Sequence, residues 1–99
     1  MPRFNDRVRI ATLARHFQDG LVSLVEIIDD GERWSVCVHY NEKAEGVKTR
    51  FLTTERIPGP RRFVGLETVW NMLSRHGITN ASVRNASPEE KKYLREGGG

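Results

Sequence analysis

The chain has 99 residues, of which 37% are hydrophobic and 29% charged, enough for one modest core and too few for a second domain. The formal net charge of +3 is a mild excess that does not by itself imply nucleic acid. The single cysteine excludes an internal disulfide and a zinc site built from cysteines. Neither a membrane span nor a secretory signal is recognisable. We therefore expect one domain over 1–96, a flexible glycine tail over 97–99, a cytoplasmic location and no membrane contact.

The first predicted helix runs from about Asp6 to Gln18, with Asn5 or Asp6 as its N-cap. Gly20 supplies the left-handed position that ends it. The apolar residues of this segment recur at helical spacing and form one stripe, made of Ile10, Leu13, Ala14 and Phe17. This stripe needs an apolar surface to pack against.

The segment Leu21–Tyr40 predicts a β-hairpin that turns at Asp30-Gly31. A two-residue turn there sets the register, with Ile27 opposite Trp34. One face of the hairpin is then apolar, made of Val25, Ile27, Trp34, Val36, Val38 and Tyr40. The other face is mixed, made of Leu24, Glu26, Arg33, Ser35, Cys37 and His39. We expect the apolar face to carry the core.

After a polar connection over 41–46, weak alternation over 47–57 predicts a third strand. The Pro-Gly-Pro sequence over 58–60 predicts a stiff turn. A second helix is expected over about Leu66–His76, because its apolar residues have helical spacing and Gly77 is a typical stop. Those residues are Leu66, Val69, Trp70 and Leu73.

A short fourth strand is expected over about Ile78–Arg84. A last, short helix follows and ends near Glu96, with Ser87 as its cap, Pro88 at its first position and a glutamate closing a capping box. The element order α-β-β-β-α-β-(α) predicts an α+β fold. We expect a three- to four-stranded antiparallel sheet with two amphipathic helices packed on one face. The uncovered face or a sheet edge is then available for a homodimer. The predicted core consists of Ile10, Leu13, Phe17, Val25, Ile27, Trp34, Val36, Val38, Phe51, Leu66, Val69, Trp70 and Leu73.

Basic residues gather in the middle of the chain, interleaved with Phe51 and Phe63. A third strand that leads into a basic loop could present a positive strip to phosphates or to an acidic protein surface. An edge strand kept soluble by charge is the alternative. The predicted nucleic-acid or partner-binding residues are Lys48, Arg50, Arg56, Arg61 and Arg62. The sequence does not separate DNA from protein as the partner.

No local pattern indicates catalysis, a metal or a cofactor. The three histidines lie on separate predicted elements, without HxxxH or CxxC spacing. Cys37 and His39 share a strand face and are the candidate nucleophile and base, but a half-exposed polar pair on a sheet face is the favoured interpretation, because no orienting group is marked. The acidic residues have structural reasons in turns, loops and helix starts. We predict a non-enzymatic protein without metal or cofactor.

The segment from Arg62 to Val83, RFVGLETVWNMLSRHGITNASV, has a basic-aromatic lead, a leucine-acid helix start, a helix ending in Gly and a short Ile/Val strand. In these features, and in the DGxRW turn, the chain resembles small accessory proteins of conjugative plasmids and integrative elements, some of them partition-associated. The resemblance covers about half of the chain. It implies a non-enzymatic accessory of a mobile genetic element that acts on DNA or a protein partner. The alternative is a protein-only inhibitor or adaptor of a host complex, of the anti-CRISPR type.

Overall fold

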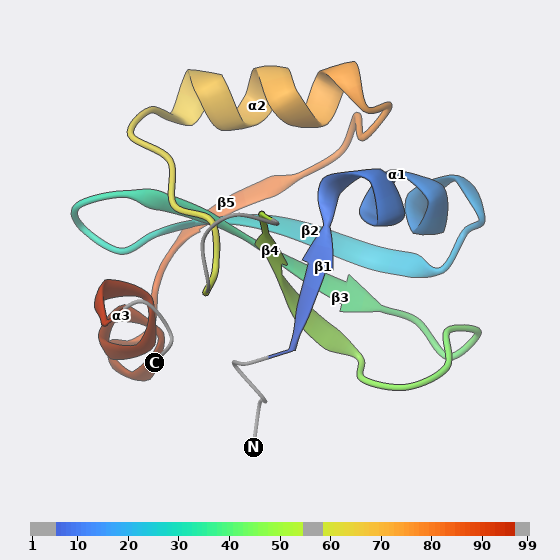
Figure 1. Ribbon diagram of the computed structural model, residues 1–99, viewed down its shortest axis with the longest axis horizontal. Helices are drawn as coiled ribbons and strands as arrows, with labels where there is room; N and C mark the ends of the chain where they lie inside the picture. Colours follow the sequence, from blue (N-terminus) through green and yellow to red (C-terminus); the bar gives the residue numbers. More distant parts are fainter. Residues whose placement is uncertain (1–5, 55–58, 97–99) are drawn as a thin grey trace.

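The computed structural model describes residues 6–54 and 59–96. The strands within these ranges are β1 (Arg7–Arg9), β2 (Val22–Asp29), β3 (Trp34–Tyr40), β4 (Thr49–Thr53) and β5 (Ser82–Asn85). The helices are α1 (Ile10–Gln18), α2 (Leu66–Arg75) and α3 (Pro88–Arg95). The strands form one sheet in the order β1-β4-β3-β2-β5, with α1 and α2 on one face and α3 on the other (Figure 1). Within the described ranges, no helix is both long and apolar enough to cross a membrane.

The α+β class is correct, but the predicted three- to four-stranded antiparallel sheet is wrong. The described residues form a five-stranded mixed sheet. Its three central strands pair antiparallel, whereas β1 pairs parallel with β4 and β5 pairs parallel with β2. Residues Arg7–Arg9, expected to be the first turn of a helix, are strand β1, and α1 begins only at Ile10. Hydrophobic periodicity could not reveal these edge pairings, because the partners lie far apart in the chain.

The hairpin is confirmed, but its turn is longer than predicted. Asp29 pairs with Trp34 and Ile27 with Val36, so the connecting loop spans residues 30–33. The register therefore differs from the expected one by two residues. Since side chains alternate with a period of two, a shift of two leaves every residue on its predicted face. The apolar face of the hairpin accordingly lies in the main core.

Gly31 in this loop has a φ of 92°, which side-chain-bearing residues rarely adopt. A Cβ atom there would lie 2.9 Å from Nη2 of Arg95. We expect Gly31→Ala to lower the free energy of unfolding by about 1–2 kcal/mol, measured by urea denaturation. Gly20→Ala is the control, because Gly20 has a φ of 74° but nothing within 4 Å of its Cβ position. A loss at Gly20 as large as at Gly31 would show that the contact with Arg95 has no effect.

The main core lies between the sheet and helices α1 and α2. Leu13 of α1 and Leu73 of α2 are fully buried there. Leu66 and Trp70, both expected in the core, are instead 38% and 41% exposed. They lie on one flank of α2, because a helix turns by about 100° per residue and the sheet covers only the side around Val69. The apolar stripe of α2 is thus wider than the surface that it covers.

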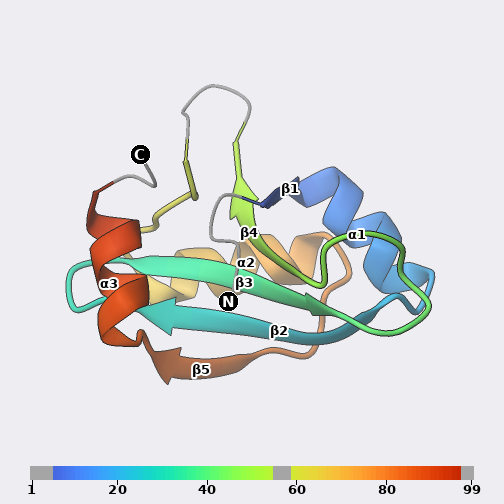
Figure 2. The same cartoon turned by 90° about the horizontal axis from the view of Figure 1, so that it is seen from below.

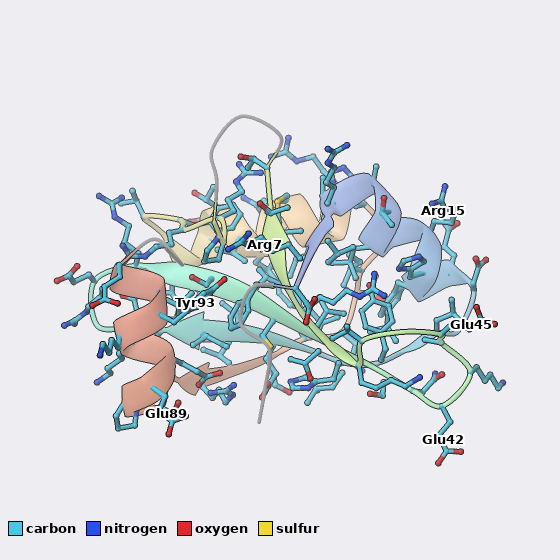
Figure 3. The ribbon with its side chains drawn as sticks, turned by 60° about the horizontal axis from the view of Figure 1, so that its bottom comes forward. Arg7, Arg15, Glu42, Glu45, Glu89 and Tyr93 are labelled. Carbon is cyan, nitrogen blue, oxygen red and sulfur yellow. The ribbon has the colours of Figure 1, made fainter. Side chains whose placement is uncertain are left out.

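A second, smaller core occupies the face of the sheet that was expected to stay uncovered. It contains Ile28, Cys37, Phe51, Ala86 and Leu94. Helix α3 closes this core and crosses one end of the sheet (Figure 2). The predicted cap of α3 is confirmed as a capping box between Ser87 and Glu90. Tyr93 of α3 accepts a hydrogen bond of 3.0 Å from Nη2 of Arg7 in β1 (Figure 3).

Candidate functional site

The four predicted basic residues that the structure describes, Lys48, Arg50, Arg61 and Arg62, lie at opposite ends of β3. At the hairpin-loop end, Nε and Nη2 of Arg62 donate to Oδ2 of Asp30 at 3.0 and 2.7 Å. The guanidinium carbon of Arg61 lies 4.4 Å from the ring centroid of Phe63. Both arginines therefore have intramolecular contacts. Arg56 lies outside the described residues.

At the other end of β3, Lys48 and Arg50 lie near Tyr40. The guanidinium carbon of Arg50 lies 4.8 Å from the Tyr40 ring centroid, and the Tyr40 hydroxyl lies 2.9 Å from Nδ1 of His16. Lys48 donates from Nζ to the carbonyl of Ala44. A hollow of about 380 Å³ opens here, lined by His16, Leu21, Tyr40, Lys43, Ala44, Glu45 and Arg50. The sequence did not indicate it, because its walls come from α1, β3, β4 and the 41–48 loop.

Arg50 and Lys43 bring two positive charges to this hollow, and Glu45 brings one negative charge. Burial, together with the nearby Arg50 and Arg15, lowers the pKa of His16. The imidazole is therefore neutral near pH 7 and adds a hydrogen-bonding group rather than a charge.

A second group of polar residues lies on the α3 face of the sheet, and we call it the Glu26 cluster: Glu26, Cys37, His39, Arg84 and Glu90. Oε1 of Glu26 lies 2.5 Å from Nε2 of His39, and its Oε2 accepts from Nε of Arg84 at 2.8 Å. Nη1 and Nη2 of Arg84 donate to the two carboxylate oxygens of Glu90 at 2.7 and 2.8 Å. Arg84 thus joins β5 to both β2 and α3.

Both carboxylates of the Glu26 cluster are largely buried, at 9% exposure each. Burial raises the pKa of Glu26, but hydrogen bonds from Arg84 and His39 outweigh it and hold the pKa below its ordinary value. The pKa of Glu90 is lowered mainly by its hydrogen bonds from Arg84, against the opposing effect of burial. Both groups are therefore ionised at neutral pH, and they raise the pKa of Arg84 in return.

Cys37 is 1% exposed, and its Sγ lies 3.8 Å from Nε2 of His39. Burial raises the pKa of the thiol to about 12, with Glu26 and Glu90 adding to the effect. The thiol is therefore protonated at neutral pH, a poor state for a nucleophile. The pair borders a hollow of about 280 Å³ lined by Cys37, His39, Thr49, Phe51, Ser87, Glu89 and Glu90.

Sequence reasoning placed Glu26, Cys37 and His39 on one face of the hairpin but did not bring them together. The predicted register sets Glu26 opposite Ser35, whereas the observed register sets it opposite Cys37. Arg84 was missed, because it reaches the cluster only through the parallel pairing of β5 with β2. No local signal in the sequence indicates that pairing.

Three exposed apolar side chains, Leu66 and Trp70 of α2 and Val83 of β5, form a surface that we call the apolar edge. Val83 pairs with Ile27, so it lies on the face that carries α2, and it is 54% exposed. Met72 of α2 accepts a hydrogen bond from Arg61 beside β4. Since a helix turns by about 100° per residue, Leu66 and Trp70 lie on the flank of α2 away from Met72. Helix and strand therefore expose apolar side chains on the same face of the sheet.

The fold and these surfaces define a small α+β protein in which helices pack on both faces of a mixed sheet, with a charged cluster on one face and an apolar edge beside the other. No protein-family model matches the chain, and no curated protein or solved structure is similar enough to count as a match. Function therefore has to be inferred from the surfaces themselves.

Proposed function

We propose that this chain is a non-enzymatic binding protein that docks on a protein partner through the apolar edge. The observation that carries this proposal is the exposure of Val83 on β5 and of Trp70 and Leu66 on α2, which covers the same face of the sheet. Large apolar side chains exposed together on a small protein are typical of an interaction surface, and tryptophan is enriched in such surfaces. This proposal corresponds to the inhibitor or adaptor alternative. The proposal includes a cytoplasmic location and a role in a mobile genetic element, both of which are inferred from the sequence alone.

The occupant that fits this edge is an extended segment of the partner. Strand β5 is an outer strand of the sheet (Figure 2). Its free side therefore presents backbone N–H and C=O groups. An added strand would pair with these groups and place alternate apolar side chains against Val83 and Trp70. The net charge of +3 favours a partner segment flanked by acidic residues.

The test is affinity capture from nuclease-treated lysate of the native host, followed by binding measurements with the purified partner. We expect Val83→Lys and Trp70→Ala each to weaken binding at least tenfold, since both remove apolar contact from the centre of the interface. Arg50→Ala is the matched control and should leave this affinity unchanged, because Arg50 lies in β4, beside the far end of β3. Equal binding by all three variants would overturn the proposal. A wild-type dimer that Val83→Lys dissociates would identify a second copy as the occupant instead.

The basic hollow around Tyr40 favours a second candidate function, the binding of DNA or another phosphate-bearing ligand. The observation that favours this function is that Arg50, Lys43 and the Tyr40 ring line one hollow. Gel shifts over a salt series test it, because neutralised phosphates make affinity fall with salt. DNA binding that Arg50→Ala reduces, and Val83→Lys does not, would support this candidate. Absent or salt-independent binding would eliminate it.

A further inference from the structure

Three side chains with different metal-ligating atoms converge inside the Glu26 cluster. A carboxylate oxygen of Glu26, Sγ of Cys37 and a ring nitrogen of His39 all lie within 4.8 Å of one another. Nε2 of His39 lies 2.5 Å from Oε1 of Glu26 and 3.8 Å from Sγ of Cys37. The three residues come from adjacent strands, because Glu26 of β2 pairs directly with Cys37 of β3. The sheet backbone therefore holds the donor set in place.

We propose that Glu26, Cys37 and His39 form a binding site for a divalent transition-metal ion of the Zn²⁺ type. Carboxylate oxygen, thiolate sulfur and imidazole nitrogen are the three ligand types that zinc takes in proteins. Tetrahedral bonds of about 2.0–2.3 Å place neighbouring ligand atoms roughly 3.3–3.7 Å apart. The distance from Sγ to Nε2 is close to this range already. The carboxylate has to move away from the imidazole by about 1 Å, which side-chain rotation of Glu26 can supply.

The charge around the site suits a divalent cation. Glu26 and Glu90 bring two negative charges, and the guanidinium of Arg84 balances one of them. On binding, the S–H bond of Cys37 breaks, the proton passes to solvent and the sulfur electron pair binds the metal. The two positive charges of the ion then offset the new thiolate and the remaining carboxylate charge. A coordinated ion thus supplies the positive charge that a buried thiolate requires.

Arg84 already performs the task of an outer-shell residue. It holds Glu26 through Oε2, on the other carboxylate oxygen from the one that faces His39. Groups of this kind orient a metal ligand without touching the metal. The hollow beside Cys37 and His39 leaves room for water as a fourth ligand. The site is thus a three-residue site with one accessible position.

The test is Co²⁺ titration of the full, untagged chain after chelator treatment, followed by absorbance spectroscopy. We expect one equivalent of Co²⁺ to produce a thiolate-to-cobalt charge-transfer band and intense visible bands of tetrahedral cobalt, both removed by added Zn²⁺. Cys37→Ser should abolish the charge-transfer band. His39→Gln and Glu26→Gln should each weaken Co²⁺ binding at least tenfold, and Arg84→Lys about tenfold. His76→Gln, at the C-terminal end of α2, is the matched control and should bind like wild type.

A second measurement separates metal binding from misfolding. Zn²⁺ should raise the melting temperature of the wild type and of His76→Gln, but not of Cys37→Ser, because a ligand stabilises only the form that binds it. Circular dichroism without metal verifies the fold of each variant. A folded wild-type protein that gives no cobalt bands, or a Cys37→Ser variant with an unchanged spectrum, would overturn the proposal. So would equal affinity losses in His39→Gln and His76→Gln. The outcome is independent of partner docking, since the apolar edge shares no residue with the site.

Discussion

Replacing Arg84 by methionine should lower the free energy of unfolding at pH 7 by about 3 kcal/mol, and so the melting temperature by roughly 12–24 °C. The guanidinium serves two carboxylates that are each 9% exposed, and its removal leaves both charges buried. Glu26 keeps His39 as a partner, and Glu90 keeps the backbone N–H of Ser87 at 2.9 Å. We place the loss at the low end for buried pairs, because the Arg84 side chain is 34% exposed. Urea and thermal denaturation measure it.

The same substitution should reverse the pH dependence of stability in the acidic range. In the wild type, the pKa values of Glu26 and Glu90 are lowered by folding. Their ionisation therefore stabilises the fold above the ordinary carboxyl pKa, and this contribution is lost as the pH falls. Without Arg84, burial and mutual repulsion should raise both pKa values above those of the unfolded chain. The variant should then lose stability as the pH rises from about 4 to 6.

A second substitution makes this prediction specific. Adding Glu90→Gln to Arg84→Met removes one of the uncompensated charges, so the double variant should recover part of the lost stability at pH 7. Removing a complete buried pair costs less than removing one partner. If the double variant is no more stable than Arg84→Met alone, the loss arises from packing rather than from buried charge.

Asp30→Ala is expected to cost about 3–4 kcal/mol at pH 7. Asp30 is completely buried, and its Oδ1 accepts from the backbone N–H groups of Glu32 and Arg33 at 2.9 and 2.8 Å. Its Oδ2 binds Arg62, and its carbonyl accepts from Nη2 of Arg95 at 2.9 Å. One side chain thus shapes the hairpin loop and ties it to the segment before α2. Removal leaves backbone donors and a partly buried guanidinium without their acceptor.

The pH dependence at Asp30 identifies the source of this cost. Burial raises the pKa of Asp30, but hydrogen bonds from the backbone of Arg33 and Glu32, and from Arg62, outweigh it and lower the pKa on folding. The stabilisation is present above the ordinary aspartate pKa and is lost as the pH falls through the folded value. The difference in unfolding free energy between wild type and Asp30→Ala should therefore shrink below about pH 4.

The neighbouring Asp29 provides the control for Asp30. Its carboxylate accepts an exposed hydrogen bond from the backbone N–H of Gly31 at 2.8 Å. Asp29→Ala should cost less than about 1 kcal/mol. Equal losses at the two positions would show that the loop, rather than the buried contacts of Asp30, determines the effect.

Asp30 also illustrates the limit of reading the sequence alone. The pair Asp30-Gly31 correctly marks a turn, because aspartate bonds to nearby backbone N–H groups and glycine accepts a positive φ. The same local pattern says nothing about Arg62, which was predicted to bind a partner and here contacts Asp30. The position of a long basic side chain depends on which acidic group the tertiary fold brings within reach. That prediction for Arg62 stays open to the gel-shift and capture experiments.

Local patterns by themselves determined the two faces of the hairpin, the apolar stripes of α1 and α2, and the capping box of α3. Each depends on a repeat or contact that spans only a few residues. The tertiary structure alone decided the parallel pairing of β1 and β5, the burial of the second face under α3, and the exposure of Trp70. It also assembled the Glu26 cluster from β2, β3, β5 and α3. These features depend on which distant segments meet, and hydrophobic spacing along the chain carries no record of that.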